Sequence, residues 1–361
     1  MLKVIASPGS YVQGAGELTR LYSYCQSLGG KRAYIIIDRF IHDNYKETVT
    51  AGFDAAGAGI TVSVFGGECS ESEISKHCTA VGECDIIIGI GGGKTLDCSK
   101  ATAFRMQLPV IIVPTAASSD APCSRLSVLY NDDGSFDKYL PLPKNPDIVV
   151  ADTQIIACAP ARFLSSGMGD ALATYYEALA CLKSGAVTMA GGVCSEAAIS
   201  LARLCRDTLL SEGKKALLSV NAKHVTPALE KIVEANTYLS GIGFESGGLA
   251  AAHAVHNGLT ALSECHHMLH GEKVTFGLLT QLALENMPVC EFSDIVSFCK
   301  EVGLPTTLFE LGLGNADDKR LMPAAQAACA DGETIHNMPF AVTPDDVLAA
   351  MRLADSLASE M

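Results

Sequence analysis

The stretch from Asp85 to Lys100 constrains the fold more than any other part of the chain. It reads D-I-I-I-G-I-G-G-G-K-T-L-D-C-S-K. Its β-branched run, Ile86 to Ile88, has no polar alternation, which is typical of a strand buried on both faces of a parallel sheet. Three glycines, Gly91 to Gly93, then turn the chain into a segment that can continue as a helix from Lys94. A strand, a glycine turn and a helix amino-terminus together predict an anion site suited to a diphosphate.

The glycine turn matches neither standard phosphate-binding fingerprint. A Walker A loop would need glycine where Ile88 stands, and a G-x-G-x-x-G motif starting at Gly89 would need glycine where Lys94 stands. The alternative is a tight strand-to-helix turn that binds nothing. One glycine would suffice for such a turn, so three in succession favour a ligand.

Composition and charge exclude several classes of protein. The chain has 361 residues, 48% of them apolar, which is enough for two domains with separate cores. Its net charge of −14 argues against nucleic acid or an anionic membrane as the main partner, so we expect a small-molecule ligand. The 14 cysteines include no C-x-x-C pair and favour free thiols in a reducing cytosol. With no long apolar run or leader segment, we expect a soluble, cytoplasmic protein.

Further apolar runs predict additional strands. They are Tyr34 to Ile37, Thr61 to Phe65, Val110 to Val113 and Ile148 to Ala151. Asp38 follows the first of these, where a carboxylate can bind a ribose 2′-hydroxyl or cap a helix, and the pattern leaves both roles open. The segments 126–130 and 136–140 flank a D-D-G turn and predict a hairpin. Ser70 and Glu73 have the spacing of a helix start.

The segment after Val113 reads P-T-A-A-S-S-D-A-P-C-S. Its small hydroxyl residues Thr115, Ser118 and Ser119 leave room and hydrogen-bond donors for a ligand at the carboxyl edge of a parallel sheet. From about Pro160 the pattern changes to alanine, leucine and glutamate at helical spacing. We therefore expect an α/β domain over residues 1–160 and an all-helical domain over 161–361, with the active site in a cleft between them.

Five of the nine histidines fall between 253 and 270. His253 and His256 are three apart and share a helical face, and His266 and His270 would share another if their segment is helical. Upstream, Asp170 stands alone among glycine and alanine. One aspartate oxygen and two histidine nitrogens with an open position form a plausible catalytic zinc site. Spacing alone does not select the three ligands, and we interpret His266 and His267 as ordinary surface residues.

Several motifs together resemble the glycerol dehydrogenases of the iron-containing alcohol dehydrogenase superfamily. They are G-I-G-G-G-K-T-L-D, P-T-A-A-S-S-D-A-P-C-S, G-M-G-D-A-L-A-T, E-S-G-G-L-A-A-A-H-A-V-H-N-G-L-T and H-H-M-L-H-G-E-K. The resemblance extends from S-P-G-S-Y-V-Q-G to G-E-T-I-H-N-M-P and so covers nearly the whole chain. It implies a dehydroquinate synthase-like fold, with a parallel nucleotide-binding sheet followed by an all-helical domain. It also implies a homo-oligomer, often an octamer.

The resemblance also implies a role for particular residues. Zinc would be held by Asp170, His253 and His270, which would also contact the substrate, together with Asp120. NAD would be bound by Asp38, Gly91, Gly92, Gly93, Lys94, Asp97, Thr115, Ser118, Ser124, Leu126 and Tyr130. His256 would relay the proton or brace the nicotinamide.

The implied reaction is hydride transfer from C2 of zinc-bound glycerol to NAD, giving dihydroxyacetone. Three alternatives remain open. Another 1,2-diol could be the substrate, or the chain could be a dehydroquinate-synthase-like lyase, which would need several Arg or Lys in the cleft. A P-loop kinase or NTPase would use the G-K-T literally, but the spacing of its first glycine is wrong.

Overall fold

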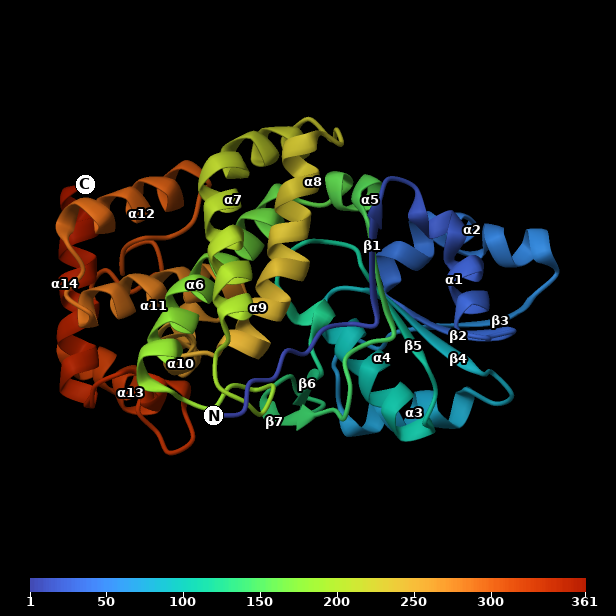
Figure 1. Cartoon of the computed structure of the whole chain (residues 1–361), viewed down its shortest axis with the longest axis horizontal. Helices are drawn as coiled ribbons and strands as arrows, with labels where there is room; N and C mark the ends of the chain where they lie inside the picture. The colour runs from blue at the N-terminus through green and yellow to red at the C-terminus, as the bar shows by residue number, and fades with distance from the viewer.

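The computed structural model describes the whole chain, residues 1–361, as an α/β half followed by a helical half (Figure 1). Six strands form one sheet in the order β1-β8-β5-β4-β2-β3, and every neighbouring pair is parallel. The strands are β1 (Ser10–Gly14), β2 (Arg32–Ile37), β3 (Gly59–Val64), β4 (Ile86–Gly91), β5 (Val110–Pro114) and β8 (Ile148–Asp152). The isoleucine and valine runs therefore form the parallel sheet that they predict.

Helices cover both faces of this sheet. They are α1 (Leu21–Ser27), α2 (Arg39–Ala56), α3 (Glu71–Ala80) and α4 (Gly93–Met106). Successive strand residues point to opposite sides, so Ile35 and Ile37 pack with Phe53 of α2, whereas Ile36 packs in the cluster that contains Leu96 of α4. Figure 1 shows α1 and α2 on one side of the sheet and α3 and α4 on the other. The strands are buried on both faces, which explains their continuous apolar sequences.

The structure confirms the hairpin and the helix start at Ser70, extends one strand and adds another. The hairpin is present as antiparallel β6 (Leu126–Tyr130) and β7 (Phe136–Pro141), and Ser70 caps α3 by accepting from Glu73 N–H. Strand β4 continues through Gly91, three residues beyond the isoleucine run. Strand β1 was not predicted, because S-Y-V-Q-G is short and mixed in polarity and becomes a strand only by pairing with β8 at the sheet edge.

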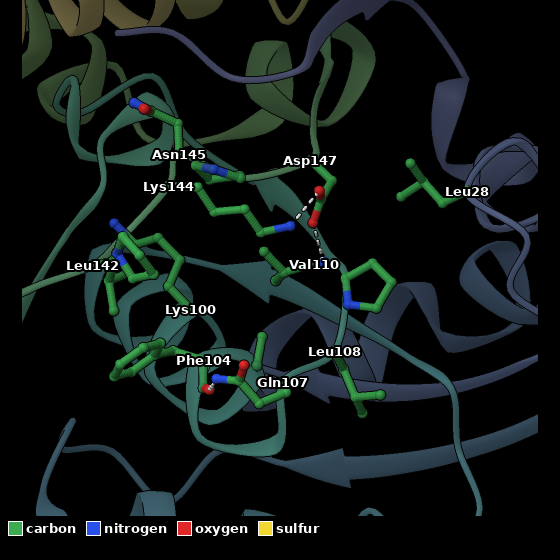
Figure 2. Close-up of a pocket in the computed structure, with 14 residues that line it drawn as sticks. Leu28, Lys100, Phe104, Gln107, Leu108, Val110, Leu142, Lys144, Asn145 and Asp147 are labelled. Carbon is green, nitrogen blue, oxygen red and sulfur yellow. Dashed lines mark hydrogen bonds and ion pairs between the residues drawn. The ribbon is translucent and has the colours of Figure 1, made fainter.

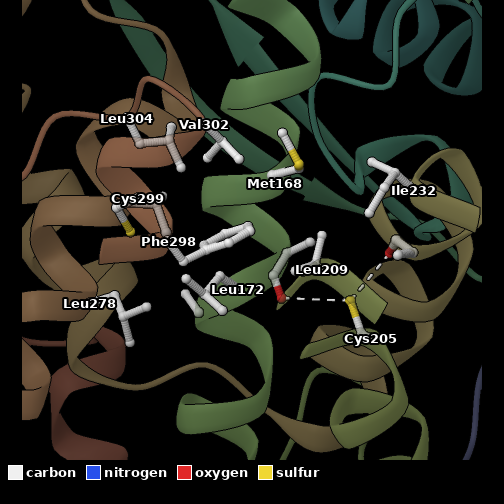
Figure 3. Packing of buried hydrophobic residues seen from close by; sticks show 14 of the residues in the cluster. Met168, Leu172, Cys205, Leu209, Ile232, Leu278, Phe298, Cys299, Val302 and Leu304 are labelled. Atoms are coloured by element: carbon white, nitrogen blue, oxygen red, sulfur yellow. Dashed lines mark hydrogen bonds between the residues drawn. The ribbon is translucent and has the colours of Figure 1, made fainter. Parts of the chain in front are cut away.

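The second half is helical, as its alanine-rich and leucine-rich pattern predicts. Its helices are α5 (Thr153–Cys158), α6 (Ala161–Ser184), α7 (Glu196–Asn221), α8 (Pro227–Glu234), α9 (Ser240–Gly247), α10 (Ala251–Leu259), α11 (His270–Leu284), α12 (Val289–Glu301), α13 (Asp318–Ala328) and α14 (Pro344–Glu360). Figure 3 shows the central packing, in which Leu172, Leu209, Leu278 and Phe298 come from α6, α7, α11 and α12. None of these helices is long and apolar enough to cross a membrane.

The loop between β5 and β6 joins the two halves. A π-helical turn between α8 and α9, η3 (Ala235–Leu239), faces this loop, and Asn236 Nδ2 donates to the carbonyl of Ala117 at 2.9 Å. Asn236 is completely buried. The carboxyl end of β5 is thereby fixed against the helical half, which places the loop that contains Asp120 beside α6.

Candidate active site

The glycine turn leaves backbone donors and open space at the start of α4. The helix begins at Gly93 with Gly92 as its N-cap, and no side chain caps it, so its first N–H groups have no side-chain acceptor. A Cβ atom added at Gly92 or Gly93 would meet no atom within 4 Å. The fold itself therefore does not require glycine at these two positions. Their bare backbone leaves room for an anionic ligand to reach the helix amino-terminus.

Lys94 lies beside this turn and is already paired with a carboxylate. Its Nζ is 2.7 Å and 2.6 Å from the two carboxylate oxygens of Glu68, which follows β3. The same ammonium lies 4.7 Å from the ring centroid of Tyr130 on β6. A phosphate bound at the glycine turn would therefore meet a lysine whose charge is shared with Glu68.

Asp38 occupies the carboxyl end of β2 and performs a structural role there. Its Oδ1 accepts from Ile41 N at 2.8 Å and so caps α2. Its Oδ2 points toward the glycine turn, because a Cβ added at Gly91 would lie 2.8 Å from that oxygen. Burial raises the pKa of Asp38 above its usual value, although the backbone amides of Ile41 and Gly92 act in the opposite direction. The cap uses only Oδ1, so it is compatible with a ribose contact through Oδ2, and that contact remains a prediction.

The other expected cofactor residues lie on β5, β6 and the loop between them. Thr115 N–H donates to the carbonyl of Gly91 at 3.2 Å, so the loop starts beside the glycine turn. Ser118 is half-buried and its carbonyl accepts from Ser166 of α6. Ser124 is buried, and Leu126 begins β6. These positions border the carboxyl edge of the sheet, where ligands of such folds bind.

Asp97 has a structural role that the sequence did not indicate. Its carboxylate is buried, with Oδ2 accepting from Val128 N at 3.0 Å and Oδ1 lying 2.9 Å from Lys100 Nζ. Lys100, also buried, donates to the carbonyls of Ala121 and Leu126. The expected cofactor contact at Asp97 therefore has no support in the geometry. Asp97 and Lys100 instead hold the hairpin and the preceding turn onto α4.

Asp170, His253 and His270 converge from three helices, α6, α10 and α11. One donor atom from each lies within 4.8 Å of the others. His253 Nε2 is 3.3 Å, and His270 Nε2 is 3.1 Å, from the same oxygen, Oδ1 of Asp170. Asp170 is completely buried, whereas the His270 side chain is 41% exposed, so the group is open on the His270 side. Two imidazole nitrogens and a carboxylate oxygen form a donor set that suits a divalent transition metal.

Two glycines allow this convergence by close backbone approach. A Cβ on Gly167 of α6 would lie 1.9 Å from the carbonyl oxygen of Ala117, and one on Gly271 of α11 would lie 1.7 Å from that of Ser166. No larger residue fits at either position. Asp170 is one turn after Gly167, and His270 immediately precedes Gly271. The close contacts therefore set the carboxylate against both the β5–β6 loop and the start of α11.

The charges of the three groups depend on one another. Burial favours the neutral form of Asp170, but the attraction of His270 and His253 outweighs burial and lowers the pKa of this carboxyl. Burial likewise opposes protonation of His253, yet the negative charges of Glu177 and Asp170 raise its pKa well above the usual value. A metal that binds at His253 would therefore compete with a proton for this side chain.

His256 and Asp120 lie next to this group. His256 Nε2 is 3.0 Å from His270 Nδ1, and burial together with the charge on His270 lowers the pKa of His256 well below its usual value. Asp120 donates its backbone N–H to Asp170 Oδ2 at 3.3 Å, and its own carboxylate accepts from Ser240 Oγ at 2.7 Å. Burial and then the charge of Asp170 raise the pKa of Asp120. Sequence reasoning did not identify Ser240, which holds the Asp120 carboxylate.

Two other expectations concern the histidines that precede His270. His266 and His267 are exposed, in agreement with a surface role, and the segment between the short turn 263–265 and His270 is not helical. His266 and His270 therefore do not share a helical face. A hollow of about 560 Å³ has Leu108, Val110 and Asp147 among its lining residues, and Figure 2 shows how these side chains lie. This hollow lies at the amino ends of β5 and β8, so it is at the opposite edge of the sheet from Asp170, His253 and His270.

The chain is similar to known oxidoreductases over its whole length. Residues 8–153 match the family model described as iron-containing alcohol dehydrogenase. A glycerol dehydrogenase of Escherichia coli O6:H1 is 54% identical over 98% of this chain and 97% of its own. A glycerol dehydrogenase of Pseudomonas putida is 54% identical over 99% and 98%. The crystal structure of a glycerol dehydrogenase from Schizosaccharomyces pombe superposes with a TM-score of 0.95 at 42% identity, covering 99% of this chain and 92% of the other.

Proposed function

The chain belongs to the iron-containing alcohol dehydrogenase family, and from this premise we propose that it oxidises glycerol to dihydroxyacetone with NAD. It is an oxidoreductase. The observation that carries the proposal is the convergence of Asp170, His253 and His270 beside Asp120, at the sheet edge that also holds the glycine turn.

The donor set at Asp170, His253 and His270 fits a divalent metal, for which we propose zinc. The Nδ1 atoms of both histidines face acceptors, Glu177 and His256, so their Nε2 atoms are available as ligands. Three protein ligands and an exposed side leave a position for substrate, as in catalytic rather than structural zinc sites. Bound zinc would lower the pKa of a coordinated hydroxyl, which alcohol oxidation at neutral pH requires.

The residues around the three donors can orient the substrate. Asp120 can accept a hydrogen bond from a second glycerol hydroxyl while Ser240 holds its carboxylate in place. His256 is buried and can brace the His270 ring through the contact between its Nε2 and His270 Nδ1. NAD would supply the hydride acceptor. Its diphosphate would be held by the amides that follow Gly92 and by Lys94, and residues of the β5–β6 loop would contact the rest of the cofactor.

We also propose that the enzyme is homo-oligomeric and cytoplasmic and that its ligand is a small polyol. Large apolar side chains stand exposed on the single chain, among them Phe40, Val187 and Phe309 at 66%, 70% and 80%. Contacts between subunits would cover such residues. Light scattering of the purified protein tests the assembly, and a monomeric mass would contradict it.

An initial-rate panel tests the proposed reaction. NADH formation is followed with glycerol and other 1,2-diols, with NAD or NADP, before and after treatment with a chelator. We expect glycerol and NAD to give the fastest rate and chelation to remove it. A faster rate with another diol would shift the substrate assignment. Release of phosphate from ATP, with no NADH formed from any diol, would favour a P-loop kinase or NTPase. NAD-dependent elimination of phosphate would favour a dehydroquinate-synthase-like lyase.

Asp38 is expected to determine the choice between NAD and NADP. Because Oδ1 caps α2 and Oδ2 faces the glycine turn, Asp38→Asn keeps the cap and removes the charge that repels a 2′-phosphate. We expect the NAD/NADP ratio in kcat/KM to narrow about tenfold or more, which corresponds to ~1.4 kcal/mol. Asp38→Ala should change the ratio similarly and also destabilise the protein by about 1 kcal/mol through the lost cap. An unchanged ratio in both variants would remove Asp38 from the cofactor site.

Glu68 is expected to weaken cofactor binding, because it already occupies the ammonium of Lys94. Glu68→Gln should therefore lower the Kd for NADH, by up to about fivefold, since an exposed ion pair is worth ~0 to 1 kcal/mol. Glu83→Gln is the control. This substitution removes the same charge, but Glu83 pairs with Arg32 at the other end of the sheet. Weaker NADH binding in Glu68→Gln would mean that Glu68 holds Lys94 in its binding position.

A further inference from the structure

Glu177 is a buried carboxylate that the proposed reaction does not use. It lies in the middle of α6 with no exposed surface, and three N–H groups converge on it. Its Oε1 accepts from the backbone N–H groups of Ala250 at 2.8 Å and His253 at 3.0 Å. Its Oε2 lies 2.6 Å from His253 Nδ1. Its only ion-pair partner is His253. Burying a carboxylate is costly, so every one of its hydrogen bonds matters for keeping it there.

The three contacts determine which ring nitrogen of His253 carries a proton. An ionised carboxylate can only accept hydrogen bonds, so Nδ1 of His253 must be the donor. The lone pair of the neutral ring is then on Nε2, which is the nitrogen 3.3 Å from Asp170 Oδ1. The carboxylate thus selects the tautomer in which His253 can act as a ligand at the site of Asp170 and His270.

The same carboxylate also fixes the helix that carries His253. Helix α10 has Ala250 at its N-cap, and no side chain of its own segment caps it. Glu177 from α6 accepts two of its amides, and Gln281 Oε1 from α11 accepts a third, that of Ala252, at 3.0 Å. The His253 backbone and ring are therefore both held by one rigid group. His270 differs, because its Nδ1 meets the imidazole of His256 and no carboxylate.

We propose that Glu177 is a positioning residue for the metal site, which locks His253 in its ligating tautomer and orientation by accepting both its Nδ1–H and its backbone N–H. The proposal rests on the proposed metal site at Asp170, His253 and His270. Its consequence is an unequal pair of histidine ligands. His253 is held by a carboxylate that also accepts its backbone N–H, and His270 only by an imidazole, so loss of Glu177 weakens metal binding more than loss of His256 does.

Glu177→Gln tests the proposal, because glutamine has nearly the same shape but one of its two ends donates. If its oxygen faces the backbone amides, its NH₂ group faces Nδ1 and selects the tautomer with the proton on Nε2. If its oxygen faces Nδ1, its NH₂ group opposes two backbone N–H groups. Either arrangement opposes ligation by His253. We expect the zinc Kd, measured by competition with a chromophoric chelator, to rise about 10-fold to 100-fold, with the Kd for NADH unchanged.

Glu245→Gln is the matched control. Glu245 is also a buried helix carboxylate, in α9, and it accepts from Asn145 Nδ2 and Arg125 N, away from the metal site. It should lower the melting temperature as Glu177→Gln does while leaving the zinc Kd at the wild-type value. The rise in melting temperature on adding zinc should shrink only in Glu177→Gln. Glu177→Asp keeps an acceptor-only group, and its zinc Kd should lie between those of wild type and Glu177→Gln.

A folded Glu177→Gln protein with wild-type zinc affinity would overturn the proposal. If Glu177→Gln does not fold, Glu177→Asp is the deciding variant. A wild-type zinc Kd in Glu177→Asp would overturn the proposal, because it would show that moving the carboxylate has no effect on the metal site. Failure of the proposed function gives a different result. In that case wild-type protein would not bind zinc stoichiometrically, or His253→Ala would bind it as well as wild type does.

Discussion

Replacing His253 or His270 with alanine is expected to remove both the bound zinc and glycerol oxidation. Each change leaves only two protein ligands from the group, and a divalent ion held by two side chains exchanges readily with water. We expect zinc content near zero by mass spectrometry and a fall in kcat/KM for glycerol of at least ~1000-fold, which corresponds to about 4 kcal/mol of transition-state stabilisation. NADH should still bind, because the glycine turn belongs to the other half of the chain.

Two further histidine variants are the controls for this result. His266→Ala should behave like wild type, because His266 is exposed and bonds only the carbonyl of Thr260. His256→Ala should keep its zinc and lose rate, since His256 contacts His270 without belonging to the three donors. Full zinc occupancy in His253→Ala would refute the ligand assignment, whatever happened to the activity.

Asp120→Asn is expected to damage glycerol binding selectively. Asparagine fills the same space and can still accept from Ser240, so the packing beside Asp170 changes little. The amide can turn its NH₂ group toward the substrate, and a substrate hydroxyl left without its acceptor costs ~1 to 3 kcal/mol. We expect kcat/KM for glycerol to fall about 10-fold to 100-fold, mainly through KM, with KM for NAD nearly unchanged.

Ser240→Ala provides a second measurement at the same point. It removes the hydroxyl that holds the Asp120 carboxylate and should raise the glycerol KM less than Asp120→Asn does. Equal increases in the KM values for glycerol and NAD, in either variant, would assign Asp120 a folding or cofactor role.

The α/β half is predictable from sequence because local patterns determine it. The runs at Ile35, Ile87 and Ile112 are apolar on both faces of their strands, and only a sheet covered on both sides accommodates that. The same reasoning fails for β1, whose residues gain strand structure only from pairing with β8. The division of the chain into domains at residue 160 remains a prediction, although α6 begins at Ala161.

The site is less predictable, because helix packing creates it. Asp170, His253 and His270 are 83 and 17 residues apart along the chain, and no periodicity connects them. The three residues come together because glycines such as Gly271 let another backbone segment approach closely. Patterns in a single sequence do not identify such contacts. The resemblance supplied the three residues where spacing could not. For Asp97 the sequence suggested a contact that the structure does not support. Its place next to the glycine motif suggested a contact with the cofactor, but its carboxylate is buried against Lys100.

Glu177 could have been identified from the sequence by one signal. It lies seven residues after Asp170, two turns along the same helix, so the two carboxylates share a face of α6. A glutamate within the apolar run A-L-A-T-Y-Y-E-A-L-A requires hydrogen-bond donors, but the sequence does not identify His253 as one of them.

Glycerol carrying deuterium at C2 gives the most direct test of the central claim, that hydride passes from C2 of the polyol to NAD. The enzyme is incubated with this substrate and NAD, and the reduced cofactor and the product are analysed by mass spectrometry. The account predicts reduced cofactor that carries one deuterium, together with dihydroxyacetone. Reduced cofactor without deuterium, formed together with glyceraldehyde, would contradict the account.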